Sequence, residues 1–176
     1  MNRKMERITT EDLKFMSLAV REAYKAKGKT LPNPAVGAVI VKNGKVISKA
    51  YHEKAGRPHA EALAIEKAGD KAKDATLYVT LEPCNHYGKT PPCTEKIIKA
   101  GIKEVVIGIR DPNPVASGGV ERLKAAGIKV KKNVFKKRCF ELISDFIVNV
   151  KYSRPFVSLK LASTLDGFIA DEKGNS

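Results

Sequence analysis

Short apolar segments alternate with helical patterns along most of this chain, and the alternation limits the fold to one class. Four segments have the length and β-branched content of strands: AVGAVIV (35–41), KVISKAY (45–51), ATLYVTL (75–81) and EVVIGI (104–109). Helices are expected from Thr9 or Thr10 to Gly28 and at 59–68, 94–101, 118–127 and 135–149, with one more strand near 128–131. Such alternation predicts an α/β fold whose largely parallel sheet is covered by helices on both faces.

The sequence also indicates where this sheet would bind a ligand. Asn43 and Gly44 tolerate the positive φ angles of a tight turn, so the first two strands are expected to form an antiparallel hairpin. Open α/β sheets bind ligands at the carboxyl ends of their strands. Cys84 follows the strand that ends at Leu81, and Cys93 opens the next helix. Both thiols are therefore expected at the ligand-binding edge of the sheet.

Composition narrows the class of protein. The chain has 176 residues, enough for one ordinary domain, and Lys plus Arg outnumber Asp plus Glu by 33 to 19, a net charge of +14. That excess predicts either an anionic partner or simply a lysine-coated surface. Three cysteines, no apolar run near ~20 residues and no leader pattern at the amino terminus favour a reducing, cytoplasmic location without a membrane partner.

Eight residues separate Cys84 and Cys93 in the stretch LEPCNHYGKTPPCTE (81–95). The pair is compatible with a redox couple, a structural metal site or a catalytic metal site. A redox couple more often has a two-residue gap, and structural zinc requires four protein ligands. His59 can serve as a third ligand and leaves one position open, which is typical of catalytic zinc. Cys139 lies among apolar residues of a helical pattern and is expected to be a buried core thiol.

Glu61 follows His59 by two positions in the motif His-Ala-Glu. On a helix that spacing places the two side chains about 200° apart, so they are not expected to be paired ligands. Glu61 is instead expected to carry protons for a metal-activated water. An HxE motif followed by Pro-Cys, two further residues and a second Cys is the signature of zinc deaminases. Here the two cysteines are separated by eight residues instead of two.

The longer motifs resemble one family. The segments are HAE (59–61), EPCNHYGKTPPC (82–93), NPAVGAVIVKNGKVISKAYHEKAG (33–56) and IGIRDPNP (107–114), and together they resemble the deaminase domain of the bifunctional riboflavin-biosynthesis deaminase/reductase. The resemblance runs from about residue 12 to 150. It implies a cytidine deaminase-like, three-layer α/β/α fold. It also implies hydrolysis of the 2-amino group of a phosphoribosyl diaminopyrimidine, with zinc as the cofactor.

The resemblance also implies roles for individual residues. His59, Cys84 and Cys93 match the zinc ligands, and Glu61 matches the proton carrier. Five further positions match residues that hold the pyrimidine, ribose and phosphate: Asn33, His52, Lys89, Asp111 and Asn113. The loop VASGGV (115–120) departs from the family pattern, because it is shorter and lacks a basic residue between its glycines.

Residues 154–176 resemble the first strand and turn of the family's NADPH-dependent reductase domain. We therefore expect a deaminase domain at 1–150, followed at 151–176 by a linker and the first strand of a truncated reductase domain. NADPH would be needed only with the missing reductase domain. An unpaired apolar strand is an aggregation hazard, so we expect it to belong to a longer chain or to dock on the domain or on a partner subunit.

Three classes of function are compatible with these sequence features. We favour a pyrimidine deaminase whose partner is a phosphorylated small molecule, and a homo-oligomer is compatible with it. A nucleic-acid deaminase would share the zinc chemistry and use the positive charge, but the basic stretches lack interleaved aromatic residues, so no nucleic acid is expected. A zinc-stabilised binding module would have four protein ligands and an inert Glu61.

Overall fold

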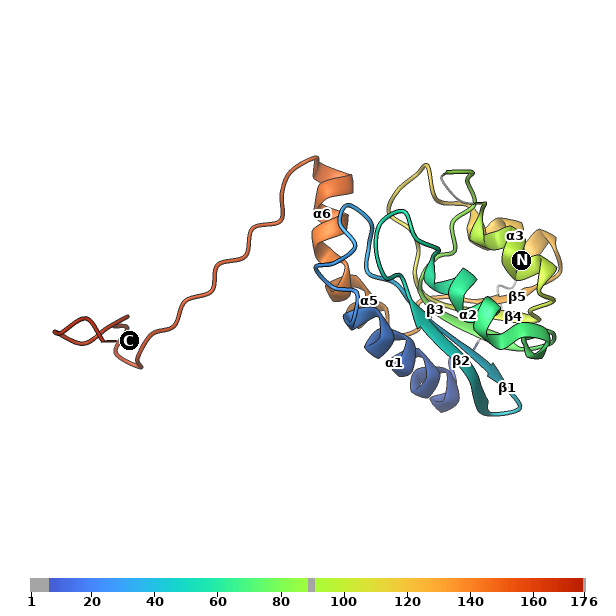
Figure 1. The fold of residues 1–176 in the computed structure, drawn as a ribbon, viewed down its shortest axis with the longest axis horizontal. Helices are drawn as coiled ribbons and strands as arrows, with labels where there is room; N and C mark the ends of the chain where they lie inside the picture. The colour runs from blue at the N-terminus through green and yellow to red at the C-terminus, as the bar shows by residue number, and fades with distance from the viewer. Residues whose placement is uncertain (1–6, 89–90, 176) are drawn as a thin grey trace.

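Five strands form one mixed sheet in the computed structural model, which describes residues 7–88 and 91–175 (Figure 1). The strands are β1 (Gly37–Lys42), β2 (Lys45–Tyr51), β3 (Thr76–Leu81), β4 (Glu104–Ile109) and β5 (Lys129–Lys131), in the spatial order β2-β1-β3-β4-β5. β1 is antiparallel to β2 and β3, whereas β3, β4 and β5 are mutually parallel. Within the described chain β1 alone opposes the other strands, which confirms the mixed, mostly parallel sheet.

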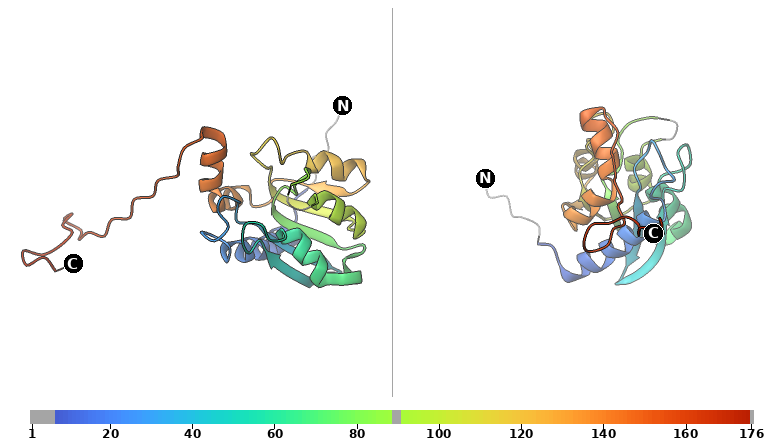
Figure 2. Two further views of the ribbon diagram at one scale, coloured as in Figure 1. Left: turned by 45° about the horizontal axis from the view of Figure 1, so that its top comes forward. Right: turned by 90° about the vertical axis from the view of Figure 1, so that its left-hand side faces the viewer.

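Helices cover the sheet in two layers. α1 (Thr10–Tyr24) packs on β1 and β3 and against α5 (Lys136–Leu142), which packs on β4. α2 (Ala60–Ala68) packs on β1 and β2 and against α3 (Cys93–Lys99), which in turn packs against α4 (Gly119–Ala125). A short 3₁₀ helix, η1 (Gly69–Ala72), follows α2. Figure 2 shows the sheet between these helices. The three-layer α/β/α sandwich is confirmed.

Local sequence explains how α1 and the hairpin begin. The Thr9 side chain accepts a hydrogen bond from the Asp12 amide while the Asp12 carboxylate accepts one from the Thr9 amide, so a capping box starts α1. Asn43 and Gly44 adopt φ angles of 51° and 70°, as a two-residue hairpin turn requires. A Cβ atom on Gly37 would lie 2.1 Å from the Ala19 carbonyl oxygen, so only glycine lets β1 approach α1 this closely.

The single helix expected at 135–149 is wrong. The segment forms two helices, α5 and α6 (Ser144–Tyr152), because Ile143 leaves the helical region with φ −118° and ψ 26°. The Lys27 ammonium group donates hydrogen bonds to the carbonyl oxygens of Glu141 and Leu142 at the break. A side chain more than a hundred positions away therefore satisfies carbonyl groups that a continuous helix would have used.

The segment after α6 runs away from the domain as an extended tail (Figure 1). Residues 153–175 contain no strand, and their apolar side chains are largely exposed, among them Val157, Leu159, Leu161 and Phe168. The strand expected here is not formed, and it does not dock on the domain. A segment becomes a strand only when a neighbouring strand pairs with its amide and carbonyl groups, and this segment has no such neighbour among the described residues.

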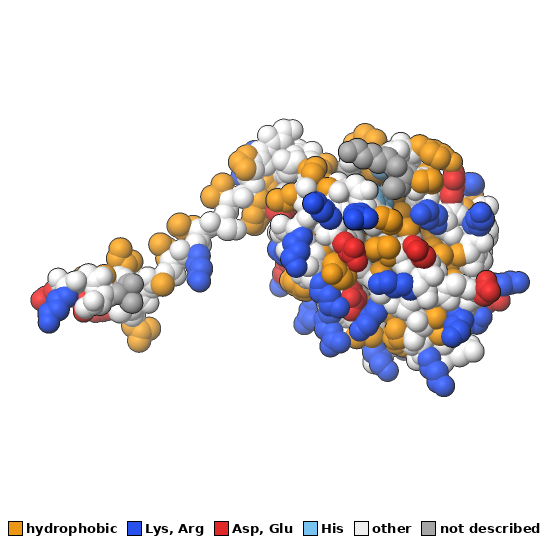
Figure 3. Space-filling model, viewed as in Figure 1, with side chains coloured by type: hydrophobic (Ala, Val, Ile, Leu, Met, Phe, Trp, Pro, Cys, Tyr) orange, Lys and Arg blue, Asp and Glu red, His pale blue; other side chains and the backbone are white. Residues whose placement is uncertain are grey.

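The surface of the domain is rich in Lys and Arg. Figure 3 shows these side chains spread over one face and interspersed with acidic ones, which fits a charged, solvated surface better than a binding patch. Among the helices that the structure describes, none has both the length and the apolar character needed to cross a membrane.

Candidate metal and substrate site

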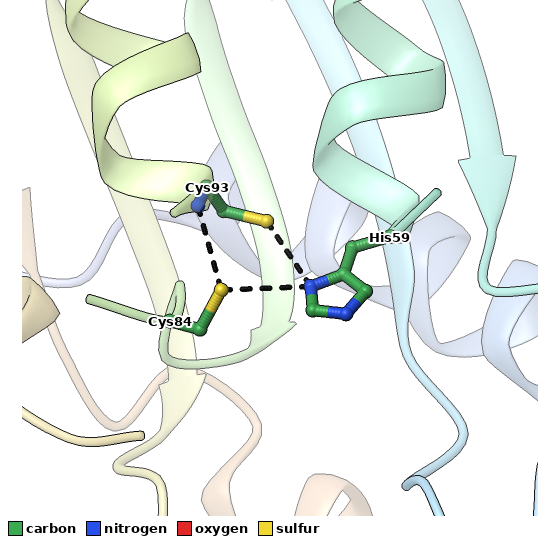
Figure 4. Close-up of side chains that lie close together, drawn as sticks. All are labelled: His59, Cys84 and Cys93. Atoms are coloured by element: carbon green, nitrogen blue, oxygen red, sulfur yellow. Dashed lines mark hydrogen bonds between the residues drawn. The ribbon is translucent and has the colours of Figure 1, made fainter. Parts of the chain in front are cut away.

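Three potential metal ligands converge where α2 and α3 begin (Figure 4). His59 is the N-cap of α2, Cys84 lies in the loop after β3, and Cys93 is the first residue of α3. His59 Nδ1 lies 3.3 Å from Cys93 Sγ and 3.5 Å from Cys84 Sγ, and the ligand atoms all lie within 4.8 Å of one another. One imidazole and two thiolates form a donor set that zinc prefers, so these residues fit zinc.

The premise that His59 and Glu61 share a helix is corrected by this geometry. His59 has an extended backbone, with φ −71° and ψ 163°, and precedes the first helical residue. Both side chains therefore reach the same pocket although they are two positions apart. Of these two residues, His59 alone belongs to the ligand cluster, as the sequence predicted, because Glu61 lies outside it.

The two thiols differ in acidity. The hydrogen bond from the Cys93 thiol, together with contacts from His59 and the Cys93 amide, lowers the pKa of Cys84 to about 4. The same hydrogen bond raises the pKa of Cys93, and the contact with Cys84 raises the pKa of His59 despite its burial. Zinc binds the thiolate forms of the cysteines and the neutral imidazole, so a bound metal ion would compete with protons at this cluster.

Glu61 lies in the first turn of α2 and is almost fully buried. Burial raises the pKa of Glu61 to about 7; the charge of His59 lowers this pKa, and the charge of Cys84 raises it further. A carboxyl group with that pKa can both accept and donate a proton near neutral pH.

A cavity of about 340 Å³ opens beside these residues. Its lining contains His59, Glu61 and Cys84 together with four of the five expected substrate residues: Asn33, His52, Asp111 and Asn113. The fifth, Lys89, lies outside the described residues. Seven of the nine residues that the sequence motifs singled out thus line one pocket, and they come from five separate segments.

His52 is buried in the wall of this pocket, and both of its ring nitrogens have protein partners. Nδ1 donates to the Pro58 carbonyl oxygen at 3.2 Å, which leaves Nε2 to accept from the Asn33 side-chain amide at 3.1 Å. Burial lowers the pKa of His52, consistent with this neutral form. Its ring also stands edge-on to His59, with 5.3 Å between centroids. His52 therefore connects Asn33 to the segment that carries the first metal ligand.

Asp111 and Asn113 lie in the loop after β4. The Asp111 carboxylate accepts from the Asn113 amide at 2.8 Å, and the Asn113 side chain accepts from the Val115 amide at 3.1 Å. These bonds shape the turn, as Asp and Asn often do. Burial raises the pKa of Asp111 to about 6. Both residues shape the loop and line the pocket at the same time.

Three polar residues of the pocket lining were not among the expected site residues: Arg57, Glu82 and His86. Arg57 is the one cation in the described lining. Among the described residues, His86 Nδ1 is buried without a hydrogen-bond partner. The available signals were the closeness of Arg57 and His86 to metal ligands in the sequence, and a charged Glu82 directly after an apolar strand.

An α/β/α sandwich that brings one imidazole, two thiols and a buried glutamate together beside the N-termini of two helices defines the class of zinc-dependent deaminases. Residues 9–109 match the family described as the cytidine and deoxycytidylate deaminase zinc-binding region. The chain belongs to this family.

Longer relatives cover nearly the whole chain. It is 55% identical over 166 residues to the riboflavin biosynthesis protein RibD of Aquifex aeolicus, an alignment that covers 94% of this chain and 47% of the relative. Its fold is similar to the crystal structure of a diaminohydroxyphosphoribosylaminopyrimidine deaminase/5-amino-6-(5-phosphoribosylamino)uracil reductase from Thermotoga maritima. That alignment has a TM-score of 0.89 and 52% identity, and covers 94% of this chain and 48% of the other. The chain therefore spans about half the length of these relatives.

Proposed function

We propose that this chain is a zinc-dependent hydrolase that deaminates 2,5-diamino-6-(5-phosphoribosylamino)pyrimidin-4(3H)-one to 5-amino-6-(5-phosphoribosylamino)uracil and ammonia, in riboflavin biosynthesis. The observation that carries the proposal is the single pocket lined by two of the metal ligands, Glu61 and four of the expected substrate residues. The relatives named for this pathway support the choice of substrate.

His59, Cys84 and Cys93 would hold the zinc ion beside the pocket that His59 and Cys84 line. Zinc bound in this way supplies a water molecule whose pKa is lowered towards ~7. Glu61 accepts a proton from the water that attacks the carbon bearing the 2-amino group. It then returns a proton to the ring nitrogen and helps the amino group to leave as ammonia, so one water is consumed for each ammonia formed.

The remaining lining residues bind or position the substrate. Asn33, Asp111 and Asn113 offer hydrogen-bonding groups to the pyrimidine and ribose. Lys89 is assigned to the phosphate by its place in the loop between the cysteines. His52 acts through Asn33, because both of its ring nitrogens are engaged by the protein.

The segment from 151 onwards is proposed to be a linker and the beginning of a reductase domain, and NADPH would serve that domain alone. The similarity to longer deaminase/reductase proteins supports this reading. We expect the 176-residue chain by itself to leave NADPH unoxidised.

Ammonia release from a panel of substrates tests the proposed function. The purified, zinc-loaded chain is incubated with the phosphorylated diaminopyrimidine, with deoxycytidylate, and with tRNA or single-stranded DNA. The proposal predicts efficient release from the phosphorylated diaminopyrimidine. Release only from nucleic acid would indicate a nucleic-acid deaminase. Zinc binding without ammonia from any substrate would indicate a binding module.

A further inference from the structure

Glu82 follows β3 directly, and its carboxylate is completely buried between two loops. One oxygen, Oε1, accepts from the Val120 amide at 3.0 Å. The other, Oε2, accepts from the Asp111 amide at 3.1 Å and forms an ion pair with Arg110 Nε at 2.8 Å. A single carboxylate thus holds both ends of the 110–120 segment.

The same two loops touch at further points. The Asn85 amide donates to the Ala116 carbonyl oxygen at 3.2 Å. A Cβ atom on Gly119 would lie 2.0 Å from the Pro83 carbonyl oxygen, so glycine is required for α4 to approach the loop that carries Cys84. The second glycine of VASGGV, the loop that departs from the family pattern, serves this close packing.

We propose that Glu82 and Arg110 are positioning residues that fix the Asp111–Asn113 turn relative to the metal ligands and thereby set the affinity for substrate. Glu82 lies two positions before Cys84, and Arg110 directly precedes Asp111. A buried carboxylate is costly without a cationic partner, and Arg110 provides that partner. When Arg110 is removed, Glu82 loses its counter-charge and its two amide contacts weaken. The turn then gains freedom to move away from the pocket.

Glu121 offers a matched control. The Arg110 guanidinium also makes two hydrogen bonds to Glu121, at 2.9 and 3.1 Å, but the Glu121 side chain is 64% exposed. Exposed ion pairs contribute little because water and salt screen them. Removing Glu121 leaves the contact between Arg110 and Glu82 in place.

The test compares Arg110→Ala, Arg110→Lys and Glu121→Ala with the parent by steady-state kinetics, zinc content and amide hydrogen exchange. This inference about substrate affinity rests on the proposed function, whereas hydrogen exchange is measured without any substrate. We expect Arg110→Ala to raise KM by about tenfold with a much smaller change in kcat. It should also speed exchange at Asp111 and Val120, with about one zinc per chain retained. Arg110→Lys should lie between Arg110→Ala and the parent, and Glu121→Ala should match the parent.

Each contrary result has a defined meaning. Unchanged exchange at Asp111 and Val120 in Arg110→Ala would overturn the positioning contact itself. Faster exchange with an unchanged KM would overturn its role in substrate affinity, and so would an equal rise in KM for Glu121→Ala. A parent protein that releases no ammonia would contradict the proposed function, while the exchange data would still decide whether Glu82 and Arg110 hold the turn.

Discussion

His59 Nδ1 lies 3.3 Å from Cys93 Sγ, although the two residues are 34 positions apart in the sequence. The N-cap of one helix and the first residue of another thus meet at one point, with Cys84 completing the cluster. Cys139 is also buried, but it packs against Gly108 of β4 and is outside the cluster. The two kinds of buried cysteine give a direct comparison.

Cys84→Ala should abolish zinc binding, because two protein ligands hold zinc far more weakly than three. Cys139→Ala should keep about one zinc per chain, since its thiol only fills the core. Metal analysis of the two purified variants beside the parent measures this. Full zinc content in Cys84→Ala would show that the metal site is built differently.

Local patterns predicted most of the fold. Apolar strands, the Asn43-Gly44 turn and the cap at Thr9 all depend on residues close in sequence, and these elements form as expected. The helix break at Ile143 was not predictable from nearby residues. The carbonyl groups of Glu141 and Leu142, beside the break, accept hydrogen bonds from Lys27 in a distant part of the sequence. The strand expected beyond residue 154 can form only beside a neighbouring strand. The sequence of this segment does not reveal whether such a neighbour is present.

The site was predictable as far as residue chemistry limits it. Zinc accepts few ligand types, so the chain's short supply of His and Cys pointed to His59, Cys84 and Cys93. The hydrogen bonds of Glu82 could not be predicted in the same way. These hydrogen bonds come from main-chain amides 29 and 38 positions away. Every residue except proline has a main-chain amide, so the sequence does not indicate which amides bind Glu82.

Asp12 should make stability depend on pH. It is buried, accepts from the Thr9 amide and pairs with Lys131 at 3.0 Å. Burial raises the pKa of Asp12, but these hydrogen bonds outweigh it, and the pKa falls below its usual 3.8. A carboxyl group whose pKa is lower in the folded state stabilises the protein at pH values above its unfolded-state pKa. That stabilisation is lost as the pH falls through its folded-state pKa.

Asp12→Asn should therefore lower the free energy of unfolding by about 1 to 3 kcal/mol at pH 7. The difference from the parent should shrink as pH falls below the usual pKa of 3.8 and through the lower pKa that Asp12 has in the folded protein. Denaturant unfolding at pH 7 and pH 3 measures this, with the exposed Asp70→Asn as control. A difference of the same size at both pH values would contradict the assigned role of the charge.

Lys89→Ala should weaken substrate binding more than it slows the chemical step. A phosphate contact far from the reacting carbon acts equally on the bound substrate and the transition state, so KM rises while kcat is nearly unchanged. Steady-state kinetics test this, with Lys99→Ala at the exposed end of α3 as control. Equal affinity of the Lys89→Ala variant and the parent for the phosphorylated substrate would remove Lys89 from the phosphate site.

Glu61 is the residue on which the proposed chemistry depends. It lies outside the ligand cluster, so glutamine at this position should leave the fold, the zinc and substrate binding intact. Glutamine keeps the shape of the side chain and cannot carry protons.

The most direct test is ammonia release from the phosphorylated diaminopyrimidine by zinc-loaded Glu61→Gln and by the parent, with zinc content measured on the same samples. We predict a loss of at least ~10²- to 10⁴-fold in rate at equal zinc content, the usual contribution of a positioned acid or base. Near-normal ammonia release by the variant, or loss of zinc together with activity, would contradict the role assigned to Glu61.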